Sequence, residues 1–479
     1  MAFLIGGANS EADTGYNVAN SCRFNDDDSP YLNKTITHGS STSGRKFTFS
    51  AWVKKSKIGG DMALFSTGTN GSNESAIRFD EDYIQFYQVY GGAVEIDITT
   101  SSLYRDPSAW MHVVVAVDTE QGTNTNRVKV YVNGTQVTSL SGTTYPDEDD
   151  DLIIGMGLDT GNGDHEIGRE QANTRNYWDG YMAEVCWIDG LQLAPTSFGE
   201  FDEDSPTIWK PIDVSGLTFG NNGAYLDFED SANLGNDKNG GTDFTENNIA
   251  AVDQAVDTPT NNFCTMNPLS VNEMTFTEGN CVATSNSNPR TDDNCRGTMG
   301  VQGGKWYWEI KSTGDSIPGV AGICDDDLKM GDDLSGEAGV YAIQNAGGTY
   351  AYRRENGTTA ETTGFPNPTN SQIFNLAFDA DNAKLYVGIN GSYYSQDGST
   401  GDPAGGSNET YASIDTSHHW LPFFEARGTA QNAQCNFGGC PGFAISSGNA
   451  DANGYGNFEY AVPSGFLALC TKNLGSSGG

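Results

Sequence analysis

Short segments in which apolar and polar side chains alternate with a period of two recur along this chain, and they constrain its fold most strongly. In segment 47–53 every second side chain is apolar, and segments 128–132 and 306–310 repeat the pattern. The pair Asn133-Gly134 follows one of these segments and is typical of a tight hairpin turn. Because side chains on a strand point alternately to its two faces, the pattern predicts antiparallel sheets with a buried face.

The composition agrees with this pattern. Glycine accounts for 60 of 479 residues, and apolar residues make up 36% of the chain. Thr, Ser, Asn, Gly, Tyr and Phe dominate, as expected of short strands joined by turns. The predicted fold class is all-β, with two antiparallel β-sandwich (jelly-roll) domains joined by an irregular connector.

Strand signals are dense in two regions of the chain, and Asn, Asp, Gly and Thr dominate between them. The predicted parts are an N-terminal arm at 1–20, a sandwich at 21–193, a connector with few strands at 194–270, a second sandwich at 271–438 and a Gly- and Ser-rich segment at 439–479. A disordered linker in place of a packed connector is the alternative.

Two further segments predict the faces of single strands. Residues 112–117 are almost continuously apolar, which predicts a strand covered on both sides. Tyr181, Ala183, Val185 and Trp187 are spaced two apart, so they are predicted to line one face of a later strand.

The formal net charge of −38 argues against anionic partners. A surface this acidic repels phosphate backbones and anionic lipid, so nucleic acid and membrane surfaces are not expected partners. No stretch approaches the roughly 18 apolar residues of a membrane span, and the N-terminus lacks the basic region of a signal peptide. We therefore expect a protein made in a cytosol and not exported by a cleaved signal.

Nine cysteines are irregularly spaced, and no histidine cluster completes a zinc site beside Cys435 and Cys440. Free thiols in a protein assembled in a reducing cytoplasm fit this pattern best.

The first sandwich resembles the laminin-G-like branch of the concanavalin A-like family. The blocks that carry the resemblance, in family order, are 47–53, 110–115, 130–134, 167–169 and 178–185. The resemblance implies a concanavalin A-like sandwich, a fold often found in proteins that bind carbohydrate.

The second sandwich resembles SPRY domains, which share this architecture. Segments 304–310, 374–394, 422–424 and 436–438 carry the resemblance, whereas 340–354 departs from the usual pattern. The order of the two sandwiches is similar to that in tailed-phage virion proteins, as are segments 22–32, 188–190 and the connector at 258–263.

The phage resemblance implies a surface component of a virion, such as a fibre, knob or decoration, assembled in the host cytoplasm and located on the virion surface. Its expected partners are other virion proteins and a host surface glycan or receptor. A homo-oligomer is expected, with a trimer favoured.

The sharpest enzymatic lead is the segment Glu95-Ile96-Asp97. Laminarinase-type glycoside hydrolases place carboxylates two apart on one strand face, with nucleophile and acid about 5 Å apart. Their last glutamate falls here on Thr99 or Thr100, so the proton donor is missing. We therefore expect a protein that is not an enzyme, with a polysaccharide-cleaving hydrolase as the alternative.

Two acidic loops could hold Ca²⁺ through oxygen ligands, and laminin-G-like domains often carry calcium at their rim. The candidate ligands are Asp147, Asp149, Asp159, Asn162 and Asp164. Neither loop completes an EF-hand, and a solvated run of charges is the alternative.

A separate cluster of aromatic and arginine side chains is the candidate ligand-binding site. Tyr350, Tyr352, Arg353 and Arg354 crowd one predicted loop or short strand, and Trp420 is a possible neighbour. Aromatic faces stack on sugar rings, and arginine bridges hydroxyls or pairs with carboxylates. An ordinary exposed hairpin is the alternative.

Two other aromatic or titratable pairs are expected to be structural. The pair Trp306 and Trp308 is predicted to lie in the core of the second sandwich, and His418-His419 to lie on a surface turn.

Overall fold

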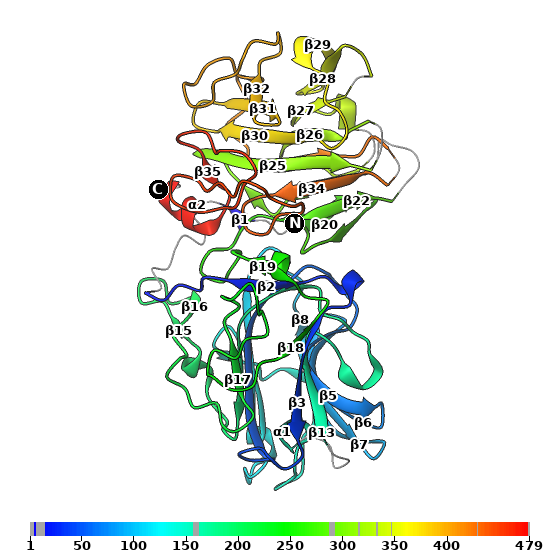
Figure 1. Cartoon of the computed structure of the whole chain (residues 1–479), viewed down its shortest axis with the longest axis vertical. Helices are drawn as coiled ribbons and strands as arrows, with labels where there is room; N and C mark the ends of the chain where they lie inside the picture. The colour runs from blue at the N-terminus through cyan, green and yellow to red at the C-terminus, as the bar shows by residue number, and fades with distance from the viewer. Residues whose placement is uncertain are drawn as a thin grey trace. The chain divides into compact units, whose positions relative to one another are not determined.

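The computed structural model describes residues 4–5, 15–156, 162–286, 293–314, 317–331, 334–345, 347–428 and 430–477. The chain forms two compact units (Figure 1). The N-terminal unit is Ala12–Thr260, and the C-terminal unit is Asn261–Gly479 together with Met1–Glu11. Each unit is built from β-sheets, as the alternating pattern predicts, and each is described separately below.

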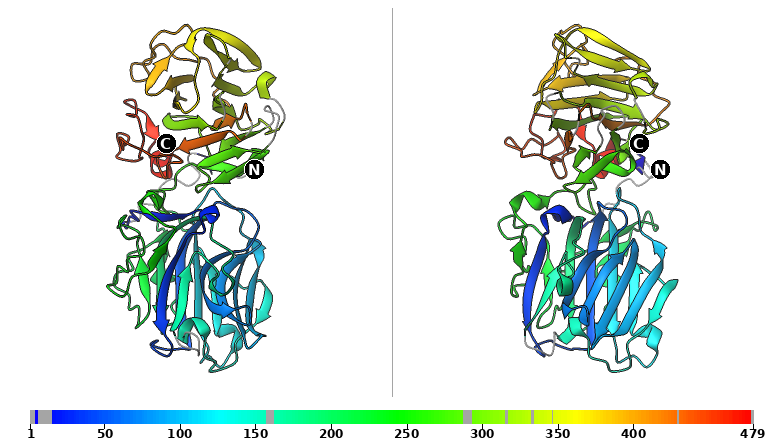
Figure 2. Two further views of the ribbon diagram at one scale, coloured as in Figure 1. Left: turned by 45° about the vertical axis from the view of Figure 1, so that its right-hand side comes forward. Right: turned by 90° about the vertical axis from the view of Figure 1, so that its right-hand side faces the viewer.

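The N-terminal unit contains two eight-stranded sheets packed face to face (Figure 2). In the β14 sheet the order is β11-β10-β9-β4-β14-β2-β19, with β17 also on β14. Its strands are β2 Ser21–Phe24, β4 Lys46–Lys55, β9 Met111–Asp118, β10 Val128–Val132, β11 Thr135–Gln136, β14 Gly180–Asp189, β17 Ala224–Leu226 and β19 Gln254–Ala255.

In the β6 sheet the order is β12-β8-β7-β6-β5-β13-β3-β18. Its strands are β3 Tyr31–Thr37, β5 Met62–Asn70, β6 Asn73–Asp80, β7 Tyr83–Tyr90, β8 Ala93–Leu103, β12 Leu140–Thr144, β13 Asn162–Ile167 and β18 Thr245–Asn247. A small pair, β15 Gly199–Phe201 and β16 Trp209–Pro211, and short helices complete the unit: η1 Asp26–Asp28, η2 Asn124–Asn126, α1 Ile153–Met156, η3 Gln171–Asn173, η4 Pro195–Ser197 and η5 Ala251–Asp253.

The core between these sheets confirms most of the predicted strand faces. From segment 47–53, the alternating side chains Phe47, Phe49, Ala51 and Val53 all lie in it. On β9, Val113, Val115 and Val117 enter the same core, while Val114 packs on the opposite side against Phe198 and its neighbours. The strand is therefore covered on both faces, as its continuous apolar run predicts.

The prediction for β14 is wrong in one respect. Ala183 packs on the outer side of the sheet, whereas Val185 and Trp187 lie in the inner core. The ladder between β14 and β4 shifts register between Ala183 and Cys186, and Glu184 has a φ of 50°. This β-bulge adds one residue to the strand, so the later side chains change face.

Of the segment 194–270 expected to form the connector, residues 194–260 belong to the N-terminal unit, and the remainder belongs to the C-terminal unit. Phe198, Val214, Phe219 and Tyr225 from this segment pack on the outer side of the β14 sheet. The segment is thus largely irregular in secondary structure but packed against the sandwich.

The C-terminal unit also contains two large sheets. In the β26 sheet the order is β20-β23-β33-β26-β27-β28-β29. Its strands are β20 Met266–Asn272, β23 Asn294–Gly297, β26 Val320–Asp325, β27 Val340–Gln344, β28 Tyr350–Glu355, β29 Thr358–Pro366 and β33 Trp420–Glu425.

In the β25 sheet the order is β21-β22-β34-β25-β30-β31-β32, with β35 on β25. Its strands are β21 Met274–Thr277, β22 Val282–Ser285, β25 Lys305–Thr313, β30 Ile373–Asp379, β31 Lys384–Ile389, β32 Ser392–Tyr394, β34 Asn432–Asn436 and β35 Leu467–Ala468. The pair β1 Leu4–Ile5 and β24 Met299–Gly300, with η6 Leu334–Gly336 and α2 Thr471–Ser477, completes the unit.

Trp306 and Trp308 lie in the core between these two sheets, as predicted. The C-terminal segment from 439 onward packs on the outer side of the β25 sheet, where Phe458 and Phe466 cover Tyr307. The buried Glu309 carboxylate accepts the backbone N–H groups of Glu459 and Tyr460 at 3.0 and 2.8 Å and so attaches this segment to β25.

All nine cysteines lie within the described residues, are buried and are not joined in disulfides. Burial raises the pKa of the Cys295, Cys324 and Cys435 thiols, which disfavours the reactive thiolate. No helix in the described part of the chain combines the length and apolar character needed to cross a bilayer.

Candidate functional site

The predicted aromatic and arginine cluster lies on β28, but only part of it reaches the surface. Tyr350 is 38% exposed, and Tyr352 and Arg353 are half-buried. Arg353 is engaged by the carboxylate of Glu355 and by Gln396, whose Oε1 accepts its Nη1–H at 2.8 Å. The exposed part of the cluster is therefore mainly aromatic.

Arg354 requires a correction, because only 1% of the residue is exposed. Its guanidinium donates to both oxygens of Glu425, at 2.6 and 2.7 Å, and its Nε–H donates to Gln344 at 2.8 Å. Successive side chains on β28 point to opposite faces, so Arg354 is directed away from Arg353. Arg354 is part of a buried, fully bonded ion pair and does not contribute to an exposed rim.

Trp420 is also buried. Its Nε1–H donates to the Asp415 carbonyl at 2.8 Å, and its ring packs edge-on against Tyr341 with centroids 5.3 Å apart. The side chain therefore supports the interior of the C-terminal unit, and the predicted neighbourhood of Trp420 and Tyr350 on one surface is not present.

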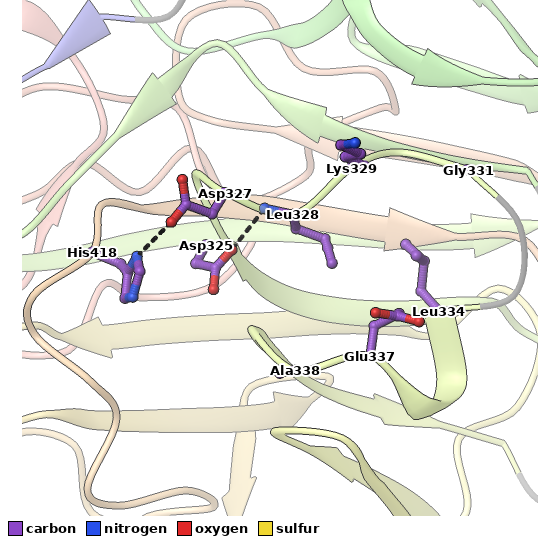
Figure 3. Close-up of a pocket in the computed structure, with 9 residues that line it drawn as sticks. All are labelled: Asp325, Asp327, Leu328, Lys329, Gly331, Leu334, Glu337, Ala338 and His418. Carbon is purple, nitrogen blue, oxygen red and sulfur yellow. Dashed lines mark hydrogen bonds and ion pairs between the residues drawn. The ribbon is translucent and has the colours of Figure 1, made fainter.

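A pocket of about 550 Å³ opens at the Asp325 end of β26, on the outer side of the β26 sheet (Figure 3). Asp325 ends β26, and the loop that follows it forms much of the wall. The side chains that define the pocket are Asp325, Asp327, Leu328, Leu334, Glu337 and His418, with Lys329 also on the lining.

The apolar part of the pocket comes from the way this loop packs. Leu328 and Leu334 are buried against Val340, Leu421 and other side chains of the β26 sheet. Asp327 and Glu337 are exposed above them. The pocket therefore combines an apolar floor with carboxylates at its rim.

Arg296 on β23 holds the shape of the aspartate loop. Its buried guanidinium donates to the backbone carbonyls of Asp325, Asp326 and Leu328 at 3.1, 3.3 and 3.2 Å, and to the Ser270 hydroxyl at 2.6 Å. One fully buried cation thus satisfies three carbonyls of an irregular turn, which positions the loop before any ligand binds.

Glycine at position 339 allows the backbone on the other side of the pocket to lie close to the Asp325 carboxylate. Its φ is 80°, and a Cβ atom at this position would lie 2.1 Å from Asp325 Oδ2. The Asp325 amide donates to the Gly339 carbonyl at 2.9 Å. A residue with a side chain would displace the Asp325 carboxylate from the pocket, so glycine at this position keeps the carboxylate in place.

The electrostatics of the pocket depend on three successive aspartates and two histidines. Asp325 Oδ1 accepts the Leu328 N–H at 2.8 Å, yet burial, followed by the charges of Asp327 and Asp326, raises the pKa of Asp325. His418 Nδ1 lies 3.6 Å from Asp327, and His419 Nδ1 lies 3.2 Å from Asp326. These imidazoles partly offset the negative charge when they are protonated.

The predicted calcium ligands that the structure describes lie on two different elements, the acidic loop at 147–149 and β13. Asp149 accepts from Arg45 at 3.0 Å, and Asp164 accepts from the Thr35 hydroxyl at 2.6 Å. Asp147 belongs to the same acidic loop as Asp149, and its backbone N–H donates to Asp150 at 2.8 Å.

Asn162 is the first residue of β13, and Asp159 lies outside the described residues. Within the described ranges, no three His, Cys, Asp or Glu side chains are arranged to hold a metal ion.

The two carboxylates of the enzymatic lead are separated by a β-bulge on β8. Tyr87 and Gln88 of β7 pair with Asp97 and Ile96 of β8. The next residue of β7, Val89, pairs with Val94 and so skips Glu95. Glu95 is thus the extra residue. Its carboxylate accepts from Gln88, while Asp97 accepts from Gln85, which lies three residues earlier on β7. The alternation assumed from the sequence fails at the bulge, so the two acids do not face one sugar bond.

Comparisons with known proteins agree with a sandwich of the lectin type for the N-terminal unit. Residues 28–191 match the laminin-G-like family model of the concanavalin A-like lectin/glucanases superfamily. A search of curated proteins found no match.

Solved structures similar to this chain include two SPRY domains. The PSpry domain of TRIM65 is 13% identical, with a TM-score of 0.27, and the alignment covers 36% of this chain and 91% of that domain. The SPRY domain of human HERC1 has the same identity, TM-score and coverage of this chain, with 96% of the domain covered.

A third similar structure is a protein from Bacteroides ovatus described as a candidate carbohydrate-binding protein. It is 17% identical, with a TM-score of 0.33, and the alignment covers 48% of this chain and 59% of that protein.

Sequence reasoning missed Asp325, Arg296 and Gly339 as parts of a site. The run Asp325-Asp326-Asp327 directly after the apolar segment 320–324 was the available signal, because a charged run that ends a buried strand marks a surface edge. Nothing local links it to His418, which lies almost a hundred residues later in the chain.

Proposed function

We propose that this chain is a non-catalytic surface protein of a tailed-phage virion that binds a glycan of the host surface. The sequence resemblance to phage virion proteins supports the setting. The match of residues 28–191 to a lectin and glucanase superfamily supports carbohydrate as the ligand class. The observation that carries the binding role is the pocket at Asp325.

The chemistry of this pocket suits a polyhydroxylated ligand. Carboxylates accept hydrogen bonds from sugar hydroxyls, and the floor formed by Leu328 and Leu334 offers an apolar surface to the C–H face of a ring. His418 adds a group that either donates or accepts a hydrogen bond. Its volume of about 550 Å³ falls in the range of small-ligand sites.

The exposed Tyr350 is a second candidate contact in the same unit, because tyrosine supplies a rigid face for stacking at little cost in conformational entropy. The net charge of −38 favours the binding of neutral or cationic glycans, since an acidic polysaccharide would be repelled.

The test is direct binding of the purified full chain to a panel of immobilised bacterial surface glycans. We expect Asp325→Asn and His418→Ala to lower the affinity for whichever glycan binds by about tenfold or more. Glu361→Gln is the matched control, because it removes one exposed charge from the same unit outside the pocket. Equal affinities for all four proteins would refute the assignment of the pocket.

The competing function is cleavage of a polysaccharide on the same fold. Incubation with laminarin, agarose and alginate, followed by measurement of new reducing ends, separates the two proposals. Turnover that Glu95→Gln abolishes would overturn the non-catalytic assignment and would require the β8 bulge to rearrange on binding.

The proposed setting also includes symmetric assembly into a trimer on the virion. Weak glycan contacts multiply into useful avidity when several copies act together. Light scattering of the purified chain and labelling of intact particles test this part. A monomer in solution together with single copies on particles would refute it.

A further inference from the structure

Lys34 lies in the interior of the N-terminal unit, where a lysine is rare. It is on β3 between Leu32 and Ile36, and all three side chains point to the buried face. Its Nζ donates to the Gly223 carbonyl at a long 3.5 Å and lies 5.5 Å from the centroid of the Phe244 ring. Burial lowers the pKa of the Lys34 ammonium, which favours the neutral amine.

Asp237 faces this amine from the segment that covers β3. Its side chain is fully buried, and its Oδ2 lies 3.7 Å from Lys34 Nζ. Oδ1 accepts the backbone N–H groups of Tyr225 and Asn239 at 3.0 and 3.1 Å. Oδ2 has no partner within hydrogen-bond distance among the described residues.

Glycine at 241 allows this arrangement, because a Cβ atom there would lie 2.3 Å from Asp237 Oδ2. The carboxyl oxygen is therefore confined beside the amine. Asp243 accepts the Asp237 backbone N–H at 2.9 Å and fixes the turn that carries it.

Two other buried lysine–aspartate pairs in the same unit differ from this one. Lys54 Nζ lies 2.7 Å from Asp257, whose second oxygen accepts from Trp110 at 2.9 Å. In the second pair, Lys55 Nζ lies 2.5 Å from Asp82. These ion pairs are closely bonded, whereas the Lys34–Asp237 pair is too long for a hydrogen bond and leaves a buried carboxyl oxygen unsatisfied, which is costly for charged groups.

We propose that Lys34 and Asp237 condense to an intramolecular amide that joins β3 to the segment covering it. The ammonium–carboxylate pair and the amine–carboxylic acid pair contain the same number of protons, so transfer of one proton within the pair gives the reactive form. Burial lowers the pKa of the Lys34 ammonium and so favours the neutral amine in this low-dielectric site.

The Lys34 Nζ lone pair then attacks Asp237 Cγ, and the Nζ–Cγ bond forms. The Cγ–Oδ2 bond breaks, and the oxygen leaves as water with its own proton and one from the amine. No oxidant, reductant or cofactor is needed, and the product removes both buried charges.

Intact-mass spectrometry of the denatured full chain tests this proposal. We expect a mass lower than the sequence mass by one water. A protease digest should contain one branched peptide that joins the segments around Lys34 and Asp237, with no cleavage by trypsin after Lys34. Lys34→Met and Asp237→Ala should each restore the full mass expected of the variant.

Lys54→Met is the matched control, because Lys54 is also a buried lysine but forms a close ion pair with Asp257. This variant should keep the loss of one water, since Lys34 and Asp237 are unchanged. Peptide mapping of the unmodified chain decides the question even if a variant fails to fold. The full sequence mass, with the Lys34 and Asp237 peptides separate, would overturn the proposal. So would a loss of water that persists in Lys34→Met, since cyclisation of an aspartate with its own backbone also releases water.

Discussion

Replacement of Glu184 by glutamine is predicted to change how the stability of the N-terminal unit depends on pH. Glu184 is the bulge residue of β14 and only 5% of it is exposed. Its Oε2 accepts hydrogen bonds from Tyr225 at 2.8 Å and Tyr16 at 3.0 Å. Desolvation, reinforced by the charges of Asp227 and Glu229, outweighs these bonds and raises the pKa of Glu184 to about 7.

The magnitude follows from the difference between this value and the reference of 4.5, which is 7 − 4.5, or about 2.5 units. At about 1.4 kcal/mol per unit, the ionised carboxylate lowers the free energy of unfolding by at most about 3.5 kcal/mol. The pKa of Glu184 is higher in the folded state than in the unfolded state. The protonated Glu184 side chain therefore makes its full contribution to the free energy of unfolding below pH 4.5. This contribution is lost as the pH rises through 7.

The effect is measured by chemical denaturation of the full chain and of the Glu184→Gln variant at pH 5 and pH 8. Hydrogen exchange in peptides from β14 then shows whether the change lies in this strand. Glutamine accepts the same tyrosine bonds but carries no charge at either pH. We expect similar stabilities at pH 5 and a variant that is more stable by up to about 3.5 kcal/mol at pH 8. A difference between the two proteins that does not change with pH would refute the reasoning.

Asp257→Asn is a suitable control, because it replaces the buried carboxylate that lies 2.7 Å from Lys54 Nζ. It should destabilise the unit at both pH values.

Three further predictions concern the C-terminal unit. Gly339→Ala should abolish glycan binding with only a modest change in melting temperature, because its Cβ would displace the Asp325 carboxylate; unchanged binding would contradict the described pocket. Arg354→Ala should lower the free energy of unfolding by about 3–5 kcal/mol, as it removes the guanidinium that binds both oxygens of the buried Glu425 carboxylate, and denaturant titration measures this. Truncation after Gly438 should cause aggregation or loss of cooperative unfolding in a thermal melt, because Glu309 loses two backbone donors and the aromatic face of the β25 sheet becomes exposed.

Some parts of this fold can be predicted from local sequence. Segments 47–53 and 306–310 have the expected inward faces because side chains on an uninterrupted strand alternate with a period of two. Asn133 and Gly134 both have positive φ and form the tight turn that their chemistry favours. Within such runs the residue types alone define the strand, its buried face and its turn.

Other features depend on contacts between distant segments. A bulge at Glu95 or Glu184 depends on the partner strand, so spacing alone could not show that the bulge changes the face of the following side chains. The sequence pattern predicts that Arg354 lies on the surface. In the structure it is buried, because it forms an ion pair with Glu425 from a distant strand.

Burial, register and the pocket are therefore properties of the assembled sheets. The carboxylate of Asp325 and the imidazole of His418 meet because β26 and β33 pair, and Lys34 and Asp237 meet because a late segment covers β3. Local sequence carries the period-two pattern and the turns, since these reflect the geometry of a few consecutive residues. Solvent exclusion and charge pairing come from long-range packing, so the site and its chemistry arise only when the sheets assemble.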